Sequence, residues 1–402
     1  MRRTPRTVLL LATALVLAGC GGRVPNTGGG DPTWVPKPEG PAAAQPEPQL
    51  PGEPLPGPNG PSGTPSPGQP GQQSPGGQDD PNVLATNLRE PWGLALLPDG
   101  NALVGERTTG RILRVHLDRT KPEVVQTIAG LDATGDGGLL GLALSPAYRE
   151  DRLVFAYVTG RTDNRVVKFE LGSTPSPVLT GIPKGRTGNG GRIQFGPDNQ
   201  LYIGTGDAGN PQAAQDKRTL AGKVLRVDEF GKPAEGNPTT GSPIYTFGHQ
   251  SVVGLCWTNN REMFAVDNAG TEGEVDGLTP GRNYGWPTVR GSEAKPGYVA
   301  PKLVVPTGNA PAGDCAIVDF GMFVTSLTAR RLLVIPLDST DQPGTPRGLL
   351  AGTYGRLRSV VAAPDGALWL TTANRDGKGS PVPTDDRVIR IVPPPETTSS
   401  PV

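Results

Sequence analysis

Two arginines near the end of the chain have a spacing that suits anion binding. Arg356 and Arg358 stand two residues apart in a segment with the composition of a β-strand. Residues at positions i and i+2 of a strand point to the same face, so the two guanidinium groups could fork onto carboxylates together. The alternative is a solvated pair, or a pair engaged in ion pairs within the protein.

Other residues that commonly carry catalysis are scarce. The chain contains only two histidines, which excludes a metal site built from three of them. We interpret His116 as a residue at the end of a strand and His249 as a hydrogen-bonded structural residue rather than a catalytic one. The sequence lacks a Gly-x-Ser-x-Gly elbow, a phosphate-binding glycine-rich loop and paired metal-binding cysteines. With 38 basic and 38 acidic residues the net charge is zero, so nothing indicates a nucleic-acid partner.

The first twenty residues have the features of an export signal. Arginines precede an apolar stretch, Val8 to Leu17, that is too short for a comfortable transmembrane span. The sequence Leu-Ala-Gly-Cys that ends at Cys20 resembles the bacterial lipobox, whose cysteine is lipidated and becomes N-terminal after cleavage. We therefore predict a lipoprotein signal peptide over residues 1–19 and a chain anchored through Cys20 to the extracytoplasmic face of the cell membrane. The alternative is an ordinary signal peptide with an incidental cysteine.

Cys256 and Cys315 are the two cysteines that remain once Cys20 carries lipid. Disulfides persist outside the cytoplasm, so we predict that these two form a bond. Closing a loop of this length stabilises a fold by roughly 4 kcal/mol in the chain-entropy model. Two separately buried thiols are the alternative.

The composition changes sharply along the chain. From Gly21 to Asp80 roughly half of the residues are Pro or Gly, and such a segment buries too little apolar surface to fold. We predict a lipidated cysteine and a disordered linker over residues 20–82, a globular domain over residues 83–393 and a flexible tail over residues 394–402.

Within the globular part, a strand that runs into a tight turn, often Pro-Asp-Gly, recurs at intervals of about 50 residues. The copies are Trp92–Gly100, Leu140–Pro146, Arg192–Asn199, Val253–Trp257 and Ser359–Gly366. Further strands follow most of them. Arg330–Leu337 supplies the third strand of a unit whose first two strands are not clearly recognisable in the sequence. Three or four strands per unit are typical of propeller blades, so this part predicts an all-β, six-bladed β-propeller. A two-sheet sandwich, the alternative, would not repeat such turns at this period.

The third repeat carries the most specific motifs. Gly190–Asp198, Leu201–Asp207 and Leu220–Asp228 resemble the soluble glucose/sorbosone dehydrogenase family, the PQQ-dependent aldose dehydrogenases. Other matching segments stand in the family's order, namely Gly138–Ala143, Gly248–His249, Asn283–Pro287 and Tyr354–Arg358. The resemblance implies a six-bladed propeller that oxidises the C1 hydroxyl of an aldose to a lactone, with hydride transfer to PQQ.

The residue that accepts the sugar's proton in the family is missing. The family has a histidine directly before the residue that precedes Gly-Gly-Arg, and this position is Gly188 here. Loss of a general base typically costs about 10²- to 10⁴-fold in rate. Asp136 occupies a polar position that the family places near the sugar, and it is our candidate for a replacement base. An aspartate that caps a turn is the alternative.

The resemblance also implies cations that hold the carboxylates of the cofactor. Arg356 and Arg358 occupy two such positions, whereas Gln250 and Ser251 replace an Arg-Asn pair and Thr328 falls where the family has a lysine. We predict Arg356, Arg358, Gln250 and Ser251 as the cofactor-binding residues, with two of the expected cations missing.

Calcium is the metal that the resemblance implies. Glu272, Glu274 and Asp276 offer the oxygen ligands that calcium prefers. The Gly-Pro whose carbonyls bridge calcium to PQQ in the family is Asn268-Ala269 here, so we predict a structural ion at the three acids. An acidic surface loop is the alternative.

Three functions follow from these observations. The first is a membrane-anchored, extracytoplasmic, PQQ-dependent aldose dehydrogenase. The second, which the departures from the family pattern slightly favour, is a catalytically inactive propeller that binds a carbohydrate, a cell-wall fragment or a protein. The third, a hydrolytic propeller such as a lactonase, would need clustered polar and acidic residues, for which Asp136, Asp207 and Glu274 are candidates.

Overall fold

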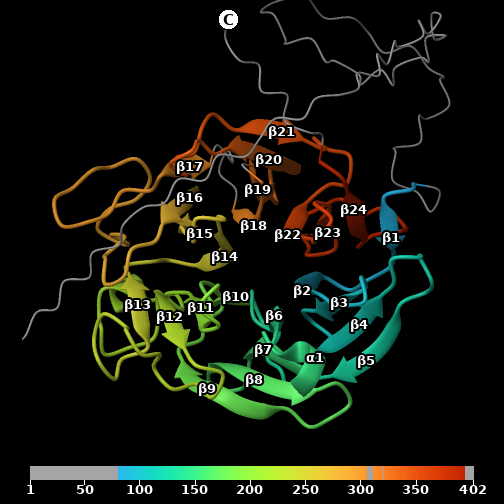
Figure 1. Cartoon of the computed structure of the whole chain (residues 1–402), viewed down its shortest axis with the longest axis horizontal. Helices are drawn as coiled ribbons and strands as arrows, with labels where there is room; N and C mark the ends of the chain where they lie inside the picture. The colour runs from blue at the N-terminus through green and yellow to red at the C-terminus, as the bar shows by residue number, and fades with distance from the viewer. Residues whose placement is uncertain (1–79, 306–310, 320, 394–402) are drawn as a thin grey trace, which may run out of the picture. The chain divides into compact units, whose positions relative to one another are not determined.

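The computed structural model describes residues 80–305, 311–319 and 321–393. The predicted signal peptide, Cys20, nearly all of the predicted linker and the tail over residues 394–402 lie outside this range. The described residues form six four-stranded antiparallel sheets arranged in a ring (Figure 1). The prediction of an all-β, six-bladed β-propeller is thereby confirmed.

The first three blades follow one another along the chain. Blade 1 consists of β2 (Pro91–Leu96), β3 (Ala102–Glu106), β4 (Arg111–Val115) and β5 (Glu123–Thr127). Blade 2 consists of β6 (Leu139–Leu144), β7 (Leu153–Thr159), β8 (Asn164–Glu170) and β9 (Ser176–Ile182), with the one-turn helix α1 (Tyr148–Asp151) between its first two strands. Blade 3 consists of β10 (Gly190–Phe195), β11 (Leu201–Thr205), β12 (Lys223–Val227) and β13 (Ile244–Phe247), and carries the 3₁₀ turn η1 (Pro211–Ala214).

The last three blades repeat this plan. Blade 4 consists of β14 (Val252–Trp257), β15 (Met263–Ala269), β16 (Glu272–Gly277) and β17 (Leu303–Val305). Blade 5 consists of β18 (Ala312–Val318), β19 (Gly321–Ser326), β20 (Arg331–Pro336) and β21 (Arg347–Leu349). Blade 6 consists of β22 (Leu357–Ala362), β23 (Leu368–Thr372) and β24 (Val388–Ile391), completed by β1 (Val83–Ala85).

Blade 6 joins the two ends of the domain. Its outer strand β1 pairs antiparallel with β24, so the N-terminal strand holds the C-terminal blade and closes the ring. The final residues of the predicted linker also contact this blade, because the Tyr354 hydroxyl donates to the Asp80 carboxylate at 2.7 Å.

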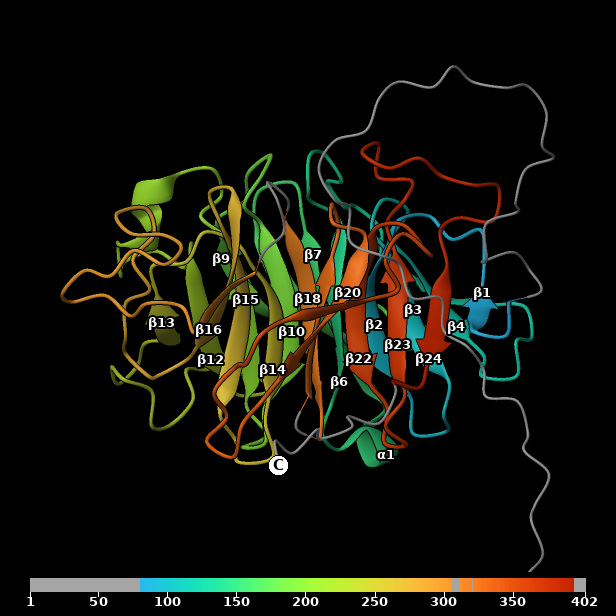
Figure 2. The same cartoon turned by 90° about the horizontal axis from the view of Figure 1, so that it is seen from above.

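The inner strands β2, β6, β10, β14, β18 and β22 surround the centre of the ring (Figures 1 and 2). Their backbones approach so closely that a Cβ atom at Gly141 would collide with the Gly191 carbonyl, and one at Gly313 with the Arg358 carbonyl. Side chains of neighbouring blades then pack face to face. Phe155 and Tyr157 of β7, for example, pack with Ile193 of β10 and Ile203 of β11, and each such buried side chain contributes about 1.5–3 kcal/mol.

Each inner strand is irregular near its start. Register shifts lie between Gly190 and Ile193 in β10, between Ala312 and Cys315 in β18, and between Leu357 and Val360 in β22, with counterparts in β2, β6 and β14. A bulge bends a strand and re-aims its side chains. The six bulges therefore shape one end of the central space.

The predicted disulfide is confirmed. Cys256 of β14 and Cys315 of β18 are bonded, with their Cα atoms 5.8 Å apart, and so the bond joins the inner strands of blades 4 and 5. Among the described residues, no helix has the length and apolar character needed to cross a membrane.

Candidate active site

A cavity of about 150 Å³ lies where the bulged ends of the inner strands meet. Its lining comes from all six blades or the connections that lead into them. The polar lining residues are Asp136, Ser251, Asn268, Arg356, Arg358, Ser359, Asp376 and Lys378. Two larger hollows lie among the outer strands. The first, of about 720 Å³ between blades 1 and 2, is lined by no acid and no histidine. In the second, of about 890 Å³, the one lining acid, Glu106, is already ion-paired with Arg111. We therefore place the candidate site in the central cavity.

Arg356 and Arg358 lie in this cavity in different states. The Arg356 guanidinium donates to the Asp376 carboxylate through Nε at 3.2 Å and Nη2 at 2.7 Å, and also to the Leu327 carbonyl at 3.2 Å. The Arg358 guanidinium lies 3.7 Å from Asp376 and makes no side-chain hydrogen bond to any described residue. Burial lowers the pKa of Arg358 to about 10, against the favourable charge of Asp376. Arg356 is thus occupied by a carboxylate, and Arg358 is available for one.

Asp136 is held by the segment that the family's histidine would occupy. The backbone N–H of Gly188 donates to one carboxylate oxygen at 2.9 Å, and the Asn189 side-chain amide donates to the other. Asn189 is itself fixed, since its amide oxygen accepts from the Gly185 N–H at 2.9 Å and from the Asn164 amide at 3.0 Å. Burial raises the pKa of Asp136, and these hydrogen bonds oppose the shift.

Gly188 has no room for a side chain. Its φ is +70°, a conformation that L-residues other than glycine rarely adopt, and a Cβ there would collide with an oxygen of Asp207. The Asp207 carboxylate is fixed by the Gly209 N–H at 2.8 Å and the Trp286 indole N–H at 2.9 Å. The local backbone therefore excludes the family's histidine unless Asp207 moves.

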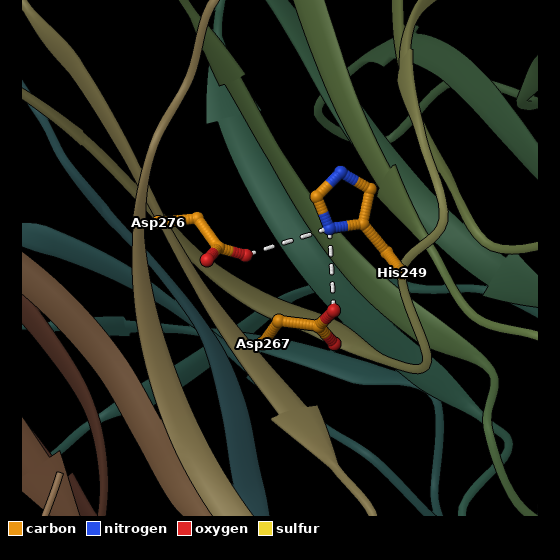
Figure 3. A group of neighbouring side chains, drawn as sticks. All are labelled: His249, Asp267 and Asp276. Atoms are coloured by element: carbon orange, nitrogen blue, oxygen red, sulfur yellow. Dashed lines mark hydrogen bonds and ion pairs between the residues drawn. The ribbon is translucent and has the colours of Figure 1, made fainter. Parts of the chain in front are cut away.

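A second group of chemistry-bearing side chains lies beside this site. His249, Asp267 and Asp276, which we call the His249 cluster, offer ligand atoms that all lie within 4.8 Å of one another (Figure 3). The His249 Nδ1 atom is 3.2 Å from Asp267 and 3.7 Å from Asp276, and all three residues are buried. None of the three lines the central cavity.

The pairing of β15 with β16 explains why these acids meet. Asp267 stands opposite Glu274, and Ala265 stands opposite Asp276, so the three acids share one face of blade 4. Burial raises the pKa of Glu274 to about 8, with the charge of Asp267 adding to the shift. Burial also raises the pKa of Asp276 well above its ordinary value, and the charges of Glu274 and Asp267 add to it.

The fold and the cavity have counterparts among known proteins. The model of the Glucose / Sorbosone dehydrogenase family matches residues 88–382. The chain belongs to this family. A PQQ-bound aldose sugar dehydrogenase from Streptomyces coelicolor is 40% identical, covers 77% of this chain and 95% of its own, and superposes with a TM-score of 0.74. An oxidoreductase of Thermus thermophilus, described as a glucose dehydrogenase, is 37% identical over 77% of this chain and 98% of its own, with a TM-score of 0.71.

Curated relatives agree with this assignment. Quinoprotein glucose dehydrogenase B of Acinetobacter calcoaceticus is 29% identical over 260 residues, which are 54% of each chain, so this chain spans about half the length of that relative. An aldose sugar dehydrogenase of Escherichia coli is 24% identical over 74% of this chain and 90% of its own. The resemblance inferred from the sequence motifs is confirmed.

Of the other residues predicted from the family pattern, some line the cavity and others do not. Ser251 lines it, whereas Gln250 does not, and the Gln250 side-chain carbonyl instead accepts from the Gly270 N–H. Thr328 is exposed and lies outside the lining. Of the predicted calcium ligands, only Asp276 belongs to the His249 cluster, while a Glu274 oxygen accepts from the Gly291 N–H. The calcium set of Glu272, Glu274 and Asp276 stays a prediction.

Sequence reasoning did not find two charged residues of this dehydrogenase-family cavity. Asp376 and Lys378 belong to the connection between β23 and β24, and nothing in its composition marks it as part of a site. Their spacing of two residues indicates a shared face only within a strand, and these two residues do not lie in one.

Proposed function

We propose that the chain is a PQQ-dependent aldose dehydrogenase in which Asp136 replaces the family's histidine as the base. The observation that carries the proposal is the composition of the cavity, which Asp136 lines together with Arg356, Arg358 and Lys378. The PQQ-bound Streptomyces coelicolor relative supports the choice of cofactor.

The cavity residues fit PQQ, which carries three carboxylates. The Arg358 guanidinium and the Lys378 ammonium group have no hydrogen-bond acceptor among the described residues, and Arg356 supplies a third cation. Against these three positive charges the lining sets two carboxylates, Asp136 and Asp376, which leaves one surplus positive charge. Arg356, Arg358 and Lys378 would hold the carboxylates through charge-assisted hydrogen bonds, and the Ser251 hydroxyl offers a further donor.

Asp136 would perform the proton transfer. When bound, PQQ supplies the quinone that takes up the hydride released from C1 of the sugar. The Asp136 carboxylate accepts the proton of the C1 hydroxyl as the carbonyl of the lactone forms. Its two hydrogen-bond donors, the Gly188 N–H and the Asn189 amide, orient it and leave lone pairs for the sugar.

The raised pKa of Asp136 has a consequence for the pH profile. The carboxyl must be ionised to act as a base, and burial raises its pKa above the ordinary value of 3.8. We expect kcat/KM to fall as the pH is lowered, along an acid limb whose midpoint lies above 3.8.

We further propose that Cys20 anchors this enzyme to the outer side of the membrane. The support is the lipobox-like sequence and the proline- and glycine-rich linker that follows it. An anchored quinoprotein would lie near membrane quinones, which are suitable electron acceptors. In cells that make the Cys20→Ser variant, the protein should leave the membrane fraction and lose incorporation of labelled palmitate, and retention of both would contradict the anchor.

Dye reduction tests the catalytic proposal. The purified full chain is incubated with PQQ and Ca²⁺, and a panel of aldoses is added with a dye acceptor. We expect saturable dye reduction that requires both PQQ and an aldose. A folded chain that binds an aldose or a wall fragment but reduces no dye would instead support the inactive binding propeller.

A further inference from the structure

The His249 cluster contains a carboxylate without a hydrogen-bond donor. The side chain of Asp276 is only 1% exposed, and neither of its carboxylate oxygens has a hydrogen-bond partner among the described residues. Figure 3 shows this carboxylate directed at the imidazole of His249, on the same side as Asp267. A buried carboxylate normally receives hydrogen bonds, contacts a cation or binds a metal.

The neighbouring carboxylate is fixed by the backbone. The Ser251 N–H donates to one oxygen of Asp267 at 2.6 Å, and the Gln250 N–H donates to the other at 3.0 Å. Among the described residues, no lysine or arginine forms an ion pair with Asp267 or Asp276. Two buried acids therefore face one imidazole, which as an imidazolium could balance at most one negative charge.

The imidazole is also oriented for coordination. Its Nε2 atom lies 2.9 Å from the hydroxyl of Thr246, and the ring of Tyr284 stacks on it with centroids 4.8 Å apart. A hydroxyl can donate or accept. With Nε2–H donating to Thr246, the lone pair of Nδ1 points between the two carboxylates. Such an outer hydrogen bond is the usual way to fix the tautomer of a ligating histidine.

The geometry points to a divalent metal site formed by His249, Asp267 and Asp276. The ion it fits best is Zn²⁺, a transition-metal ion of intermediate softness that accepts both nitrogen and oxygen ligands. A nitrogen donor favours such an ion over Ca²⁺ or Mg²⁺, which prefer oxygen ligands. Zinc at about 2.0–2.1 Å from each ligand in a tetrahedral arrangement requires ligand atoms about 3.3 Å apart. The observed separations from Nδ1, 3.2 and 3.7 Å, are close to this value. A water molecule can complete the coordination.

The role of this ion is structural. His249 lies on the connection from β13 to β14, whereas Asp267 and Asp276 belong to β15 and β16. A bound ion would tie the entry of blade 4 to its middle strands. The same connection carries Ser251, which lines the central cavity. The site shares only Asp276 with the predicted calcium set.

Metal binding and thermal unfolding test the proposal on the full chain, freed of metal with a chelator. We expect one equivalent of Zn²⁺ to bind and to raise the unfolding temperature. Asp276→Asn should weaken zinc binding by at least the roughly 10- to 100-fold that loss of an outer hydrogen-bond partner of a metal ligand typically costs. Without metal the same variant should unfold at a higher temperature than the wild type, because it replaces a buried carboxyl group that lacks a hydrogen-bond donor.

Asp386→Asn is the matched control. Asp386 is fully buried in the connection from β23 to β24, and one of its oxygens also lacks a hydrogen-bond partner, but it belongs to no such cluster among the described residues. This variant should keep wild-type zinc affinity. Zinc K-edge absorption of the loaded wild type gives a reading that does not depend on any variant, and it should show one imidazole among oxygen ligands. Failure to bind zinc stoichiometrically, a preference for Ca²⁺ over Zn²⁺, unchanged affinity in Asp276→Asn, or a zinc spectrum without imidazole would each overturn the proposal.

Discussion

The central cavity and the His249 cluster both contain buried or half-buried carboxylates, but these carboxylates differ in their hydrogen-bond and ion-pair partners. In the cavity, Asp136 receives two hydrogen bonds and Asp376 binds the Arg356 guanidinium. In the cluster, Asp276 receives no hydrogen bond, and its one charged partner is the imidazole of His249. The carboxylates of the cavity therefore have partners without a ligand, while its cations Arg358 and Lys378 still lack hydrogen-bond acceptors among the described residues; in the cluster it is a carboxylate that lacks a donor.

This difference separates function from stability. A site whose carboxylates already have partners can bind and release an anionic ligand at little structural cost. A buried carboxylate without a donor must either bind a partner or stay protonated, because an unpaired buried charge is expensive. Changes in the cavity should therefore alter turnover and cofactor affinity, and changes in blade 4 should alter stability.

The largest effect is expected for Asp136→Asn. An amide does not accept a proton at neutral pH, so kcat should fall about 10²- to 10⁴-fold while PQQ affinity and the unfolding temperature stay near wild type. Dye-linked kinetics and thermal unfolding measure these effects. Asp118→Asn, which changes an exposed turn aspartate, is the control and should leave kcat unchanged. Unchanged kcat in Asp136→Asn would remove Asp136 as the base.

Loss of the disulfide tests whether changes in blade 4 alter stability rather than cofactor binding. The double variant Cys256→Ala, Cys315→Ala frees the inner strands of blades 4 and 5 from each other. The chain should lose roughly 4 kcal/mol of stability, which corresponds to a fall of about 6 °C in the unfolding temperature for a domain of this size. The dissociation constant of PQQ should change by less than about twofold. A large loss of PQQ affinity at a temperature where the variant is folded would contradict the assignment of function to the cavity and of stability to blade 4.

A smaller effect is expected for Arg358→Gln. The substitution removes a cation that has no hydrogen-bonded partner, so PQQ binding should weaken by about 1.5–3 kcal/mol, or roughly ten- to hundredfold. Arg218→Gln changes an arginine that is 91% exposed and should have no effect on the dissociation constant. Equal affinity of Arg358→Gln and wild type would show that this arginine does not hold the cofactor.

The smallest effect is expected for Lys378→Gln. Lys378 lines the cavity but is exposed to solvent, where a charge contributes at most about 1 kcal/mol. PQQ affinity should fall less than about fivefold, and the fall should shrink at high salt. An effect as large as that of Arg358→Gln would mean that the loop between β23 and β24 closes over the cofactor.

The sequence was a good guide to the blades for a physical reason. Repeated strands and Pro-Asp-Gly turns are local signals, and the predicted strand Arg330–Leu337, for example, agrees with β20 (Arg331–Pro336) to within one residue at each end. Strand β18 was not recognised from the sequence because no Pro-Asp-Gly turn follows it. Local patterns identify elements that are formed by neighbouring residues.

The candidate site was less predictable because its contacts are not local. Gly188 showed that the family's base is missing, but not that the Asp136 carboxylate, 52 residues earlier, accepts a hydrogen bond from its N–H. His249 was expected to be a satisfied structural residue, and its position between two acids follows only from the register of β15 and β16. Register across a sheet is set by the packing of the whole blade.

An anaerobic titration of the PQQ-loaded full chain tests the central claim most directly. Aldose is added without any dye, and the absorbance of the oxidised quinone is followed. The account predicts that PQQ binds with one equivalent per chain and that its absorbance is lost on addition of one equivalent of a suitable aldose, in the wild type but far more slowly in Asp136→Asn. A folded chain that binds no PQQ, or that binds it and leaves the absorbance unchanged with every aldose, would contradict the account.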